Sequence, residues 1–193
     1  IEVEQIYVDE NGKRATKKYT VTKDEGPRAG TSIDALEKLR PVFAANGSVT
    51  AGNSSQMSDG AAFVMVMSED MVKELNLEPI ARLVNYAAAG VEPRIMGIGP
   101  VKAIPKALKL AGLKQADLSL IELNEAFAAQ SLGVIKELVD EHHMSKEEIL
   151  ARTNVNGGAI ALGHPVGASG NRIIVTLLHE MLKQPNVTYG LAS

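Results

Sequence analysis

The stretch Asn154-Val-Asn-Gly-Gly-Ala-Ile-Ala-Leu-Gly-His-Pro-Val-Gly-Ala-Ser-Gly-Asn-Arg172 holds five glycines within 14 residues and leads into an apolar helical pattern. Glycine allows close backbone approach and positive φ, and a glycine-rich helix entry presents N–H groups to an anion or a carbonyl oxygen. His164 precedes Pro165, which holds the histidine backbone extended and fixes where the ring points. Such a histidine can act as a general base or donate to an oxyanion. A structural turn with an incidental histidine fits the pattern equally well.

A second stretch, Glu122-Leu-Asn-Glu-Ala-Phe-Ala-Ala-Gln130, runs from the end of a predicted strand into a predicted helix. Ligands tend to bind at this end of the strands in α/β sheets. Asn124 is explained either as a helix N-cap or as an amide that holds a water or a substrate oxygen. Glu125 is interpreted as a first-turn carboxylate that complements the helix dipole, and Phe127 as a core residue.

A third stretch, residues 49–60, offers many small hydrogen-bonding groups. Polar loop groups often bind ligands, although turn chemistry alone explains most such loops. The apolar run that follows, residues 61–67, is typical of a strand buried on both faces.

The remaining pattern alternates strands and helices, which indicates an α/β layered sheet. Asn11-Gly12 between two β-rich runs predicts a hairpin, and a short helix from Thr31 is expected to bury Ile33, Leu36 and Leu39. Further strands are predicted at 80–89, 118–123, 154–156 and 187–191. Further helices are predicted from Ser68 and over 100–111, 124–142, 145–152 and 170–182.

The composition excludes several classes of function. The chain has 193 residues, a formal net charge of −3 and 45% hydrophobic residues, so neither nucleic-acid nor polybasic membrane binding is indicated. It contains no cysteine, which removes disulfides, thiolate zinc sites and a cysteine nucleophile of its own. No apolar run is long enough for a membrane span, and no signal peptide opens the chain. Because the sequence starts at Ile1 and stops inside an apolar stretch, we expect both ends to be cut.

Three motifs occur in a fixed order along the chain. They are Thr-Ala-Gly-Asn-Ser-Ser-x-x-x-Asp-Gly-Ala (50–61), Asn-Glu-Ala-Phe-Ala (124–128) and Asn-x-Asn-Gly-Gly-Ala-x-Ala-Leu-Gly-His-Pro-x-Gly-Ala-Ser-Gly (154–170). Together they resemble the motifs of thiolases, the acetyl-CoA acetyltransferases and 3-ketoacyl-CoA thiolases. Met96-Gly-Ile-Gly-Pro100 is also similar to that family. The resemblance covers roughly residues 26–193.

The resemblance implies an acyltransferase that works through a cysteine acyl-enzyme. A second cysteine removes the proton α to the carbonyl of acetyl-CoA, and the enolate attacks the acyl-enzyme in a Claisen condensation. In the reverse reaction, CoA cleaves a 3-ketoacyl-CoA. The enolate oxygen needs hydrogen-bond donors, and the resemblance assigns that role to His164 and to a water held by Asn124. His164 would also help to activate the nucleophile.

The resemblance also implies a set of residues that bind substrate. Coenzyme A thioesters are the substrates, so neither a cofactor nor a metal is expected. Arg28 would meet the phosphate–adenine end of CoA, Phe43 would pack near CoA, and Ser55 would bond the pantetheine arm. Met96 and Phe127 would line the thioester pocket.

The implied fold is a thiolase-type layered α/β fold. One βαβαβαββ half, a mixed sheet covered by helices, is expected to be nearly complete, together with the tail of the loop domain. Residues 1–55 would end the substrate-binding loop region, 56–78 would close the N-terminal core domain, and 79–193 would form the C-terminal core domain, truncated before its final strand. The parent enzyme would be a cytoplasmic homo-oligomer (a dimer or tetramer) of fatty acid and lipid metabolism, with an organelle left open.

The chain departs from the thiolase pattern because it has neither catalytic cysteine. The nucleophile is expected in an absent N-terminal half, and the second cysteine about two residues beyond Ser193 by the family spacing. We therefore expect the isolated chain to be inactive and to expose an apolar face through which it self-associates. The alternative is a non-catalytic CoA- or lipid-binding module of the same fold. A ketoacyl-carrier-protein synthase relative is disfavoured by the Asn124-Glu-Ala-Phe motif.

Overall fold

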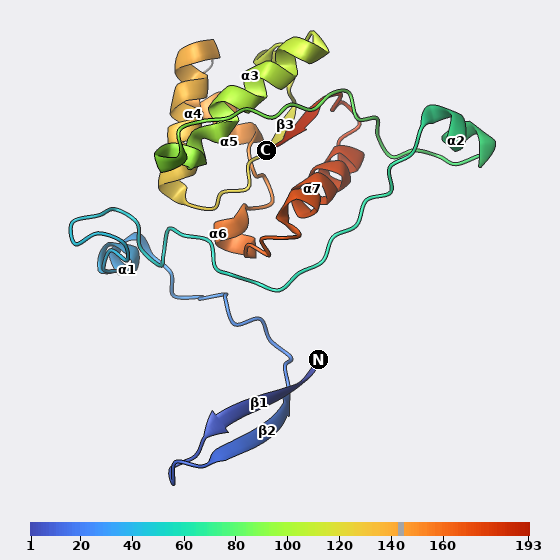
Figure 1. Ribbon diagram of the computed structural model, residues 1–193. Helices are drawn as coiled ribbons and strands as arrows, with labels where there is room; N and C mark the ends of the chain where they lie inside the picture. The colour runs from blue at the N-terminus through green and yellow to red at the C-terminus, as the bar shows by residue number, and fades with distance from the viewer. Residues whose placement is uncertain (143–144) are drawn as a thin grey trace. The chain divides into compact units, whose positions relative to one another are not determined.

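The N-terminal hairpin forms where Asn11-Gly12 predicts it. The computed structural model describes residues 1–142 and 145–193, and it divides the chain into one unit at Ile1–Ile33 and another at Asp34–Ser193 (Figure 1). In the first unit β1 (Glu2–Val8) pairs antiparallel with β2 (Arg14–Thr20). The Asp9 carboxylate accepts the backbone N–H groups of Asn11 and Lys13, and so closes the turn.

A short parallel strand pair organises the second unit. The strand β3 (Leu120–Glu122) pairs with β4 (Gly190–Ala192), with Ile121 opposite Leu191. Successive side chains of a strand point to opposite faces. Ile121 belongs to the main apolar core, whereas Glu122 turns to the opposite face, the face of α7 (Ser169–Lys183), which packs on both strands (Figure 1).

The main core lies on the other face of β3, between four helices. These are the 3-10 helix η1 (Pro93–Ile98), α3 (Gly99–Ala111), α4 (Ala128–His142) and α5 (Lys146–Arg152). Their buried side chains, together with those next to β3, are Val101, Ile104, Leu108, Leu118, Ile121, Leu123, Val134, Ile135, Leu138 and Ile149. Burial of this many large aliphatic side chains makes this core the main source of stability in the unit.

The helix ends follow local signals in the sequence. The helix α3 ends at Gly112, whose φ of +69° closes it as expected. The helix α5 begins with the predicted capping box, in which Ser145 and Glu148 satisfy each other's backbone N–H. The remaining short helices are α1 (Ile33–Glu37), α2 (Glu69–Glu74, capped by Ser68), the 3-10 helix η2 (Gln115–Asp117) and α6 (Ala159–Leu162).

Two predicted buried strands are absent, and so is the buried stripe of the first helix. Residues 61–67 and 80–89 form no strand, and Phe63 is 88% exposed. A strand needs neighbouring backbone groups to pair with, and no strand in the described part of the chain pairs with either segment. The stripe expected of α1 is exposed as well, with 74% of Ile33 accessible.

Two further predicted boundaries are wrong. The helix expected from residue 124 begins at Ala128, because the segment before it makes a turn around Glu125, which has φ +61°. The strand expected at 154–156 reduces to a single parallel bridge between Thr153 and Ile121. Across the described residues, no helix is long and apolar enough to cross a bilayer.

Candidate functional site

The glycine-rich turn is tied to the carboxyl end of β3 through Asn154. The Asn154 backbone N–H donates to the Ile121 carbonyl at 2.8 Å, and its side-chain oxygen accepts the Leu123 N–H at 2.8 Å. Asn154 adopts φ +50°, which asparagine tolerates better than most residues. The turn therefore sits where the strand ends, the place at which the sequence predicts a site.

Glu125 caps the short helix α6 rather than its own helix, which corrects the interpretation of it as a first-turn carboxylate. Its side chain accepts the backbone N–H groups of Gly158 and Ile160. Burial raises the pKa of Glu125, and these two hydrogen bonds oppose the rise. A Cβ at Gly158 would overlap the Glu125 carboxylate and the Asn154 amide, so glycine is required there for the backbones to approach.

His164 is fixed through its backbone by the motif at residues 50–61. Its N–H donates to the Gln56 carbonyl at 2.9 Å, and Met57 and His164 form a parallel bridge. Gly163, with φ +92°, allows the preceding turn, and any side chain there would meet Ser58. The segment around residue 57 thus holds the histidine that the sequence singles out.

The structure brings the two predicted catalytic side chains together. The half-buried His164 ring places Nε2 3.3 Å from the Asn124 amide nitrogen Nδ2. On the other edge of the ring, Nδ1 lies 2.7 Å from the Ser169 hydroxyl. Asn124 itself is held by main-chain bonds, donating to Ser193 and accepting from Ala159, both at 2.9 Å. Because its N–H bonds the chain beyond β4, Asn124 continues the sheet and does not cap a helix.

Two charged residues behind Asn124 were missed by the sequence reasoning. Arg172 of α7 donates from Nη2 to the Asn124 side-chain oxygen at 3.3 Å. Glu122 is 2% exposed, and burial raises its pKa to about 7 against the opposing effect of the Arg172 charge. The signal for Glu122 is its spacing of two residues from Asn124, which puts both side chains on one face of the strand.

Three of the predicted substrate-binding residues lie close to one another. The rings of Phe43 and Phe127 meet edge to face at 6.2 Å between centroids, with an angle of 73° between planes. The Ser55 N–H donates to the Ala126 carbonyl at 2.9 Å, and Ser54 bridges to Phe127. The sequence-predicted Phe43, Ser55 and Phe127 therefore gather beside the start of α4.

Of the two other predicted substrate-binding residues, Met96 belongs to η1 and Arg28 to the first unit of the chain. Met96 is 77% exposed in η1, one residue before Gly97, whose carbonyl accepts the Gln130 side chain at 2.8 Å. Arg28 is exposed in the first unit, where its carbonyl accepts the Thr31 hydroxyl. The structure describes that unit separately, so it does not join Arg28 to the site.

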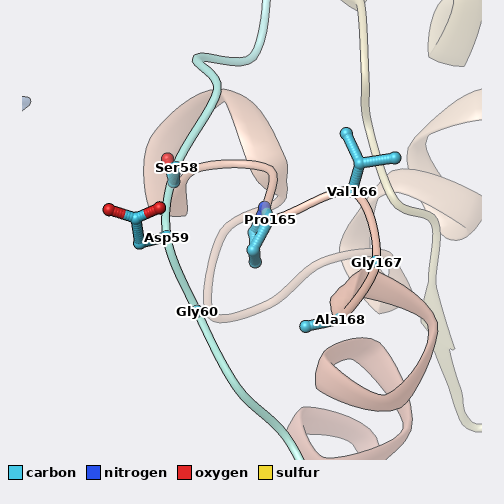
Figure 2. A pocket seen from close by; sticks show the side chains of 7 residues that line it. All are labelled: Ser58, Asp59, Gly60, Pro165, Val166, Gly167 and Ala168. Atoms are coloured by element: carbon cyan, nitrogen blue, oxygen red, sulfur yellow. The ribbon is translucent and has the colours of Figure 1, made fainter.

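A hollow of about 320 Å³ borders the loop that carries His164. Its lining residues are Ser58, Asp59, Gly60, Pro165, Val166, Gly167 and Ala168. Figure 2 shows the Asp59 carboxylate pointing away from Pro165, which leaves backbone and small side chains between the two segments. Among residues 1–142 and 145–193, no group of three metal-ligating side chains is placed to hold a metal ion.

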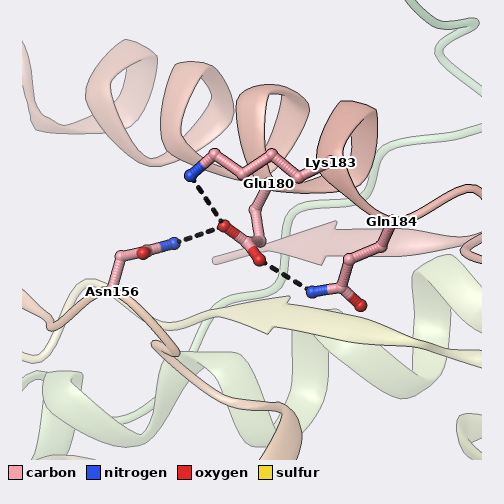
Figure 3. Close-up of polar contacts among 4 residues, drawn as sticks. All are labelled: Asn156, Glu180, Lys183 and Gln184. Carbon is pink, nitrogen blue, oxygen red and sulfur yellow. Dashed lines mark hydrogen bonds and ion pairs between the residues drawn. The ribbon is translucent and has the colours of Figure 1, made fainter.

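A polar cluster ties the start of the glycine-rich turn to α7 as well. The Glu180 carboxylate accepts from Asn156 at 2.9 Å and from Gln184 at 2.7 Å, and it pairs with Lys183 at 3.2 Å (Figure 3). These hydrogen bonds hold the pKa of Glu180 at about 2. The turn is thus fixed to β3 by Asn154 and to α7 by Asn156.

The chain matches two family models and several known proteins. The model described as "Thiolase, N-terminal domain" matches residues 5–70, and "Thiolase, C-terminal domain" matches residues 77–193. A 3-ketoacyl-CoA thiolase of Bacillus subtilis is 48% identical over this whole chain, which spans 47% of that protein. An acetyl-CoA acetyltransferase of Pseudomonas aeruginosa is 56% identical over 88% of this chain, and the match covers 41% of that protein.

Solved structures agree with these relatives. The crystal structure of the Bacillus anthracis acetyl-CoA acetyltransferase superimposes with a TM-score of 0.79 and 44% identity, over 99% of this chain and 45% of that one. Human mitochondrial 3-ketoacyl-CoA thiolase in complex with CoA gives a TM-score of 0.76 and 46% identity, over 89% and 41% of the two chains. The chain therefore spans less than half the length of the relatives it matches. With the C-terminal domain model alone covering most of its residues, this chain belongs to the thiolase family.

Proposed function

We propose that the protein containing this chain transfers acyl groups between coenzyme A thioesters, by Claisen condensation of acetyl-CoA and by thiolysis of 3-ketoacyl-CoA. The observation that carries the proposal is the pairing of Asn124 and His164, whose side-chain nitrogens lie 3.3 Å apart at the carboxyl end of β3. The names of the relatives, acetyl-CoA acetyltransferase and 3-ketoacyl-CoA thiolase, support this reaction class. The crystal structure of one relative in complex with CoA supports the substrate class.

In the proposed reaction the two side chains stabilise developing negative charge on a thioester oxygen. A donor on His164 Nε2 and a water held by the Asn124 amide would point at that oxygen. Both groups are fixed from several directions by backbone bonds, so little reorganisation accompanies the reaction. The cysteine thiol that the acyl-enzyme requires is not among the residues of this chain. The chain supplies the oxyanion site and not the nucleophile.

Binding of CoA is proposed for the residues that the family resemblance names. Phe43, Phe127 and Ser55 would contact the CoA arm, and the edge-to-face ring pair beside Ser55 supports a shared role. Met96, whose side chain is 77% exposed, would line the thioester pocket, and Arg28 would meet the phosphate–adenine end. No metal and no further cofactor takes part in the proposed reaction.

The cellular setting is part of the same proposal. We place the parent enzyme in the cytoplasm, as a homo-oligomer that serves fatty acid and lipid metabolism. Residues 1–55 would belong to the substrate-binding loop region, 56–78 to the N-terminal core domain and 79–193 to the C-terminal core domain.

A chimera tests the reaction. The matched region of the Bacillus subtilis 3-ketoacyl-CoA thiolase is replaced by this chain, and thiolysis of acetoacetyl-CoA is measured. We expect the chimera to turn over, the isolated chain to show no turnover, and His164→Ala and Asn124→Ala each to lower kcat about 100-fold. His179→Ala, an exposed histidine of α7, is the matched control and should leave kcat unchanged.

Three results would contradict the proposal. Turnover by the isolated chain would show that no cysteine is needed. Full activity of His164→Ala would remove the oxyanion role. A folded chimera that binds CoA in calorimetry but never turns over would favour the non-catalytic binding module instead.

A further inference from the structure

Arg172 fixes which way the Asn124 amide points. The guanidinium enters from the first turn of α7, and its Nη2 lies 3.3 Å from the Asn124 side-chain oxygen. Arginine carries only donors, so the amide must turn its oxygen toward Arg172. Its NH₂ group then faces His164, where Nδ2 lies 3.3 Å from Nε2. The amide orientation is thus determined by the chemistry of its two neighbours.

The amide orientation in turn determines the protonation pattern of the His164 ring. An amide NH₂ has no acceptor, so Nε2 must offer its lone pair to it. In the neutral ring the proton then sits on Nδ1, which lies 2.7 Å from the Ser169 oxygen. The Ser169 hydroxyl donates in turn to the Pro165 carbonyl at 3.2 Å. In the chain of hydrogen bonds from Arg172 through Asn124, His164 and Ser169 to the Pro165 carbonyl, every donor therefore meets an acceptor.

We infer that Arg172 and Ser169 are positioning residues that hold resting His164 in the Nδ1–H tautomer, in which Nε2 is unprotonated and can take up a proton. Each acts through another side chain: Arg172 through Asn124, and Ser169 through the ring itself. The opposite tautomer, with the proton on Nε2, would require two changes. The Ser169 hydroxyl would have to donate to Nδ1 instead of to the Pro165 carbonyl, and the Asn124 amide would have to present its oxygen to His164. The second change would leave Arg172 facing an NH₂ group.

The surroundings of Arg172 agree with a role directed at Asn124. Among the described residues, the Nε and Nη1 atoms of Arg172 are buried without a hydrogen-bond partner, and the guanidinium's hydrogen bond is the one from Nη2 to Asn124. A buried cation is costly unless it is compensated. Glu122 lies on the same face of the strand as Asn124, and it has a buried oxygen without a hydrogen-bond partner among the described residues. When it is ionised, Glu122 supplies the opposite charge, and the Arg172 charge accordingly opposes the rise in its pKa. The pair keeps a cation behind Asn124 in the interior.

The catalytic consequence rests on the proposed function. A neutral ring with a lone pair on Nε2 can accept the proton of a cysteine thiol, so that the S–H bond breaks, an N–H bond forms and a thiolate is left. The same Nε2–H then becomes the donor to the thioester oxygen, while Nδ1–H stays bonded to Ser169. One ring atom thereby serves first as base and then as oxyanion donor.

The tautomer can be measured on the chain itself. The four histidines are labelled with ¹⁵N, and the ring nitrogens are observed by NMR at alkaline pH, with His164 assigned from a His164→Gln sample. We expect Nδ1 protonated and Nε2 unprotonated. Arg172→Met should move His164 toward the Nε2–H tautomer, because the amide is freed to turn, and Arg172→Lys should restore the resting pattern. Ser169→Ala should also deplete the Nδ1–H form, and Ser169→Thr should retain it.

Controls separate positioning from general damage. Lys136→Met removes an exposed cation from α4 and should leave the His164 signals unchanged, and the His179 signals report the integrity of α7. A resting Nε2–H tautomer, or a folded Arg172→Met variant that keeps the Nδ1–H form, would overturn the inference. If Arg172→Met does not fold, Arg172→Lys and Ser169→Ala decide the question by the same signals.

The two proposals fail in different ways. An inactive chimera with His164 in the Nδ1–H tautomer would refute the proposed reaction and leave the positioning intact. In an active chimera, Arg172→Met should lower kcat roughly tenfold or more and leave KM nearly unchanged, with partial recovery in Arg172→Lys. An equal loss in kcat for Lys136→Met would show that general damage to the fold, not positioning, is measured.

Discussion

Replacement of Glu122 by glutamine should remove a pH dependence from the stability of the second unit. Glu122 is 2% exposed, and its Oε2 has no hydrogen-bond partner within the described part of the chain. Burial raises its pKa from an ordinary value of 4.5 to about 7, although the Arg172 charge opposes the rise. Glutamine has the same shape and is never charged, so Glu122→Gln mimics the protonated carboxyl at every pH.

The size of the effect follows from these two values. Between pH 4.5 and about 7 the unfolded chain has released the Glu122 proton while the folded chain still holds it. The free energy of unfolding therefore falls as pH rises through this window and levels off above it. Across the whole window the free energy of unfolding falls by about 3 kcal/mol, and roughly 2.5 kcal/mol of this loss occurs between about pH 5 and about pH 8.

Urea unfolding followed by circular dichroism measures this difference. The stability of Glu122→Gln relative to the unmodified chain should increase by about 2.5 kcal/mol from about pH 5 to about pH 8. Glu147→Gln, an exposed carboxylate of α5, is the matched control and should change little with pH. The Glu180 charge also raises the pKa of Glu122. In a Glu180→Gln variant that keeps Glu122, the fall in stability with pH should therefore end at a lower pH. A constant difference between Glu122→Gln and the unmodified chain at both pH values would refute the reasoning.

Three other predictions concern packing and exposed surface. Leu138 of α4 is 1% exposed, and Leu138→Ala should lower the free energy of unfolding in urea by about 2–5 kcal/mol. Leu132, on the same helix, is 49% exposed, and Leu132→Ala should lower it by under about 1 kcal/mol. Equal losses would contradict the assigned core. Gly158→Ala should destabilise by about 1–3 kcal/mol because its Cβ would displace the Glu125 carboxylate, and Gly167→Ala, which meets nothing within 4 Å, should be nearly neutral by the same measurement. The exposed apolar segment around Phe63 should cause concentration-dependent association in sedimentation, which Phe63→Ser reduces; a monomer at every concentration would count against this.

Elements with local signals were predictable from the sequence. The Asn11-Gly12 hairpin, the Ser68 cap, the Gly112 stop and the Ser145–Glu148 box each depend on residues a few positions apart. The conformations at these positions follow from side chains that bond their own backbone neighbours or from glycine's tolerance of positive φ. The helix α7 was predictable from the apolar helical pattern that follows the glycine-rich turn.

Features that depend on distant segments were not predictable. The apolar run at 61–67 looks like a buried strand, but burial requires neighbours that a local pattern cannot reveal. The capping of α6 by Glu125 and the bond from Arg172 to Asn124 join residues 33 or more positions apart. Asn124 and His164 could be singled out by residue type and motif. Their direct contact, and the charges behind them, needed the fold.

The backbone bonds around residue 56 mean that the boundary between the two family domains does not separate two folding units. Gln56 lies in the stretch matched by the N-terminal model, yet it holds His164, and Asn53 likewise accepts the Ala128 N–H at 2.9 Å. A protease nick in the exposed segment near Phe63 should therefore leave both pieces bound to each other. A C-terminal domain exchanged on its own would need an upstream segment that supplies the same backbone carbonyls to His164 and Ala128.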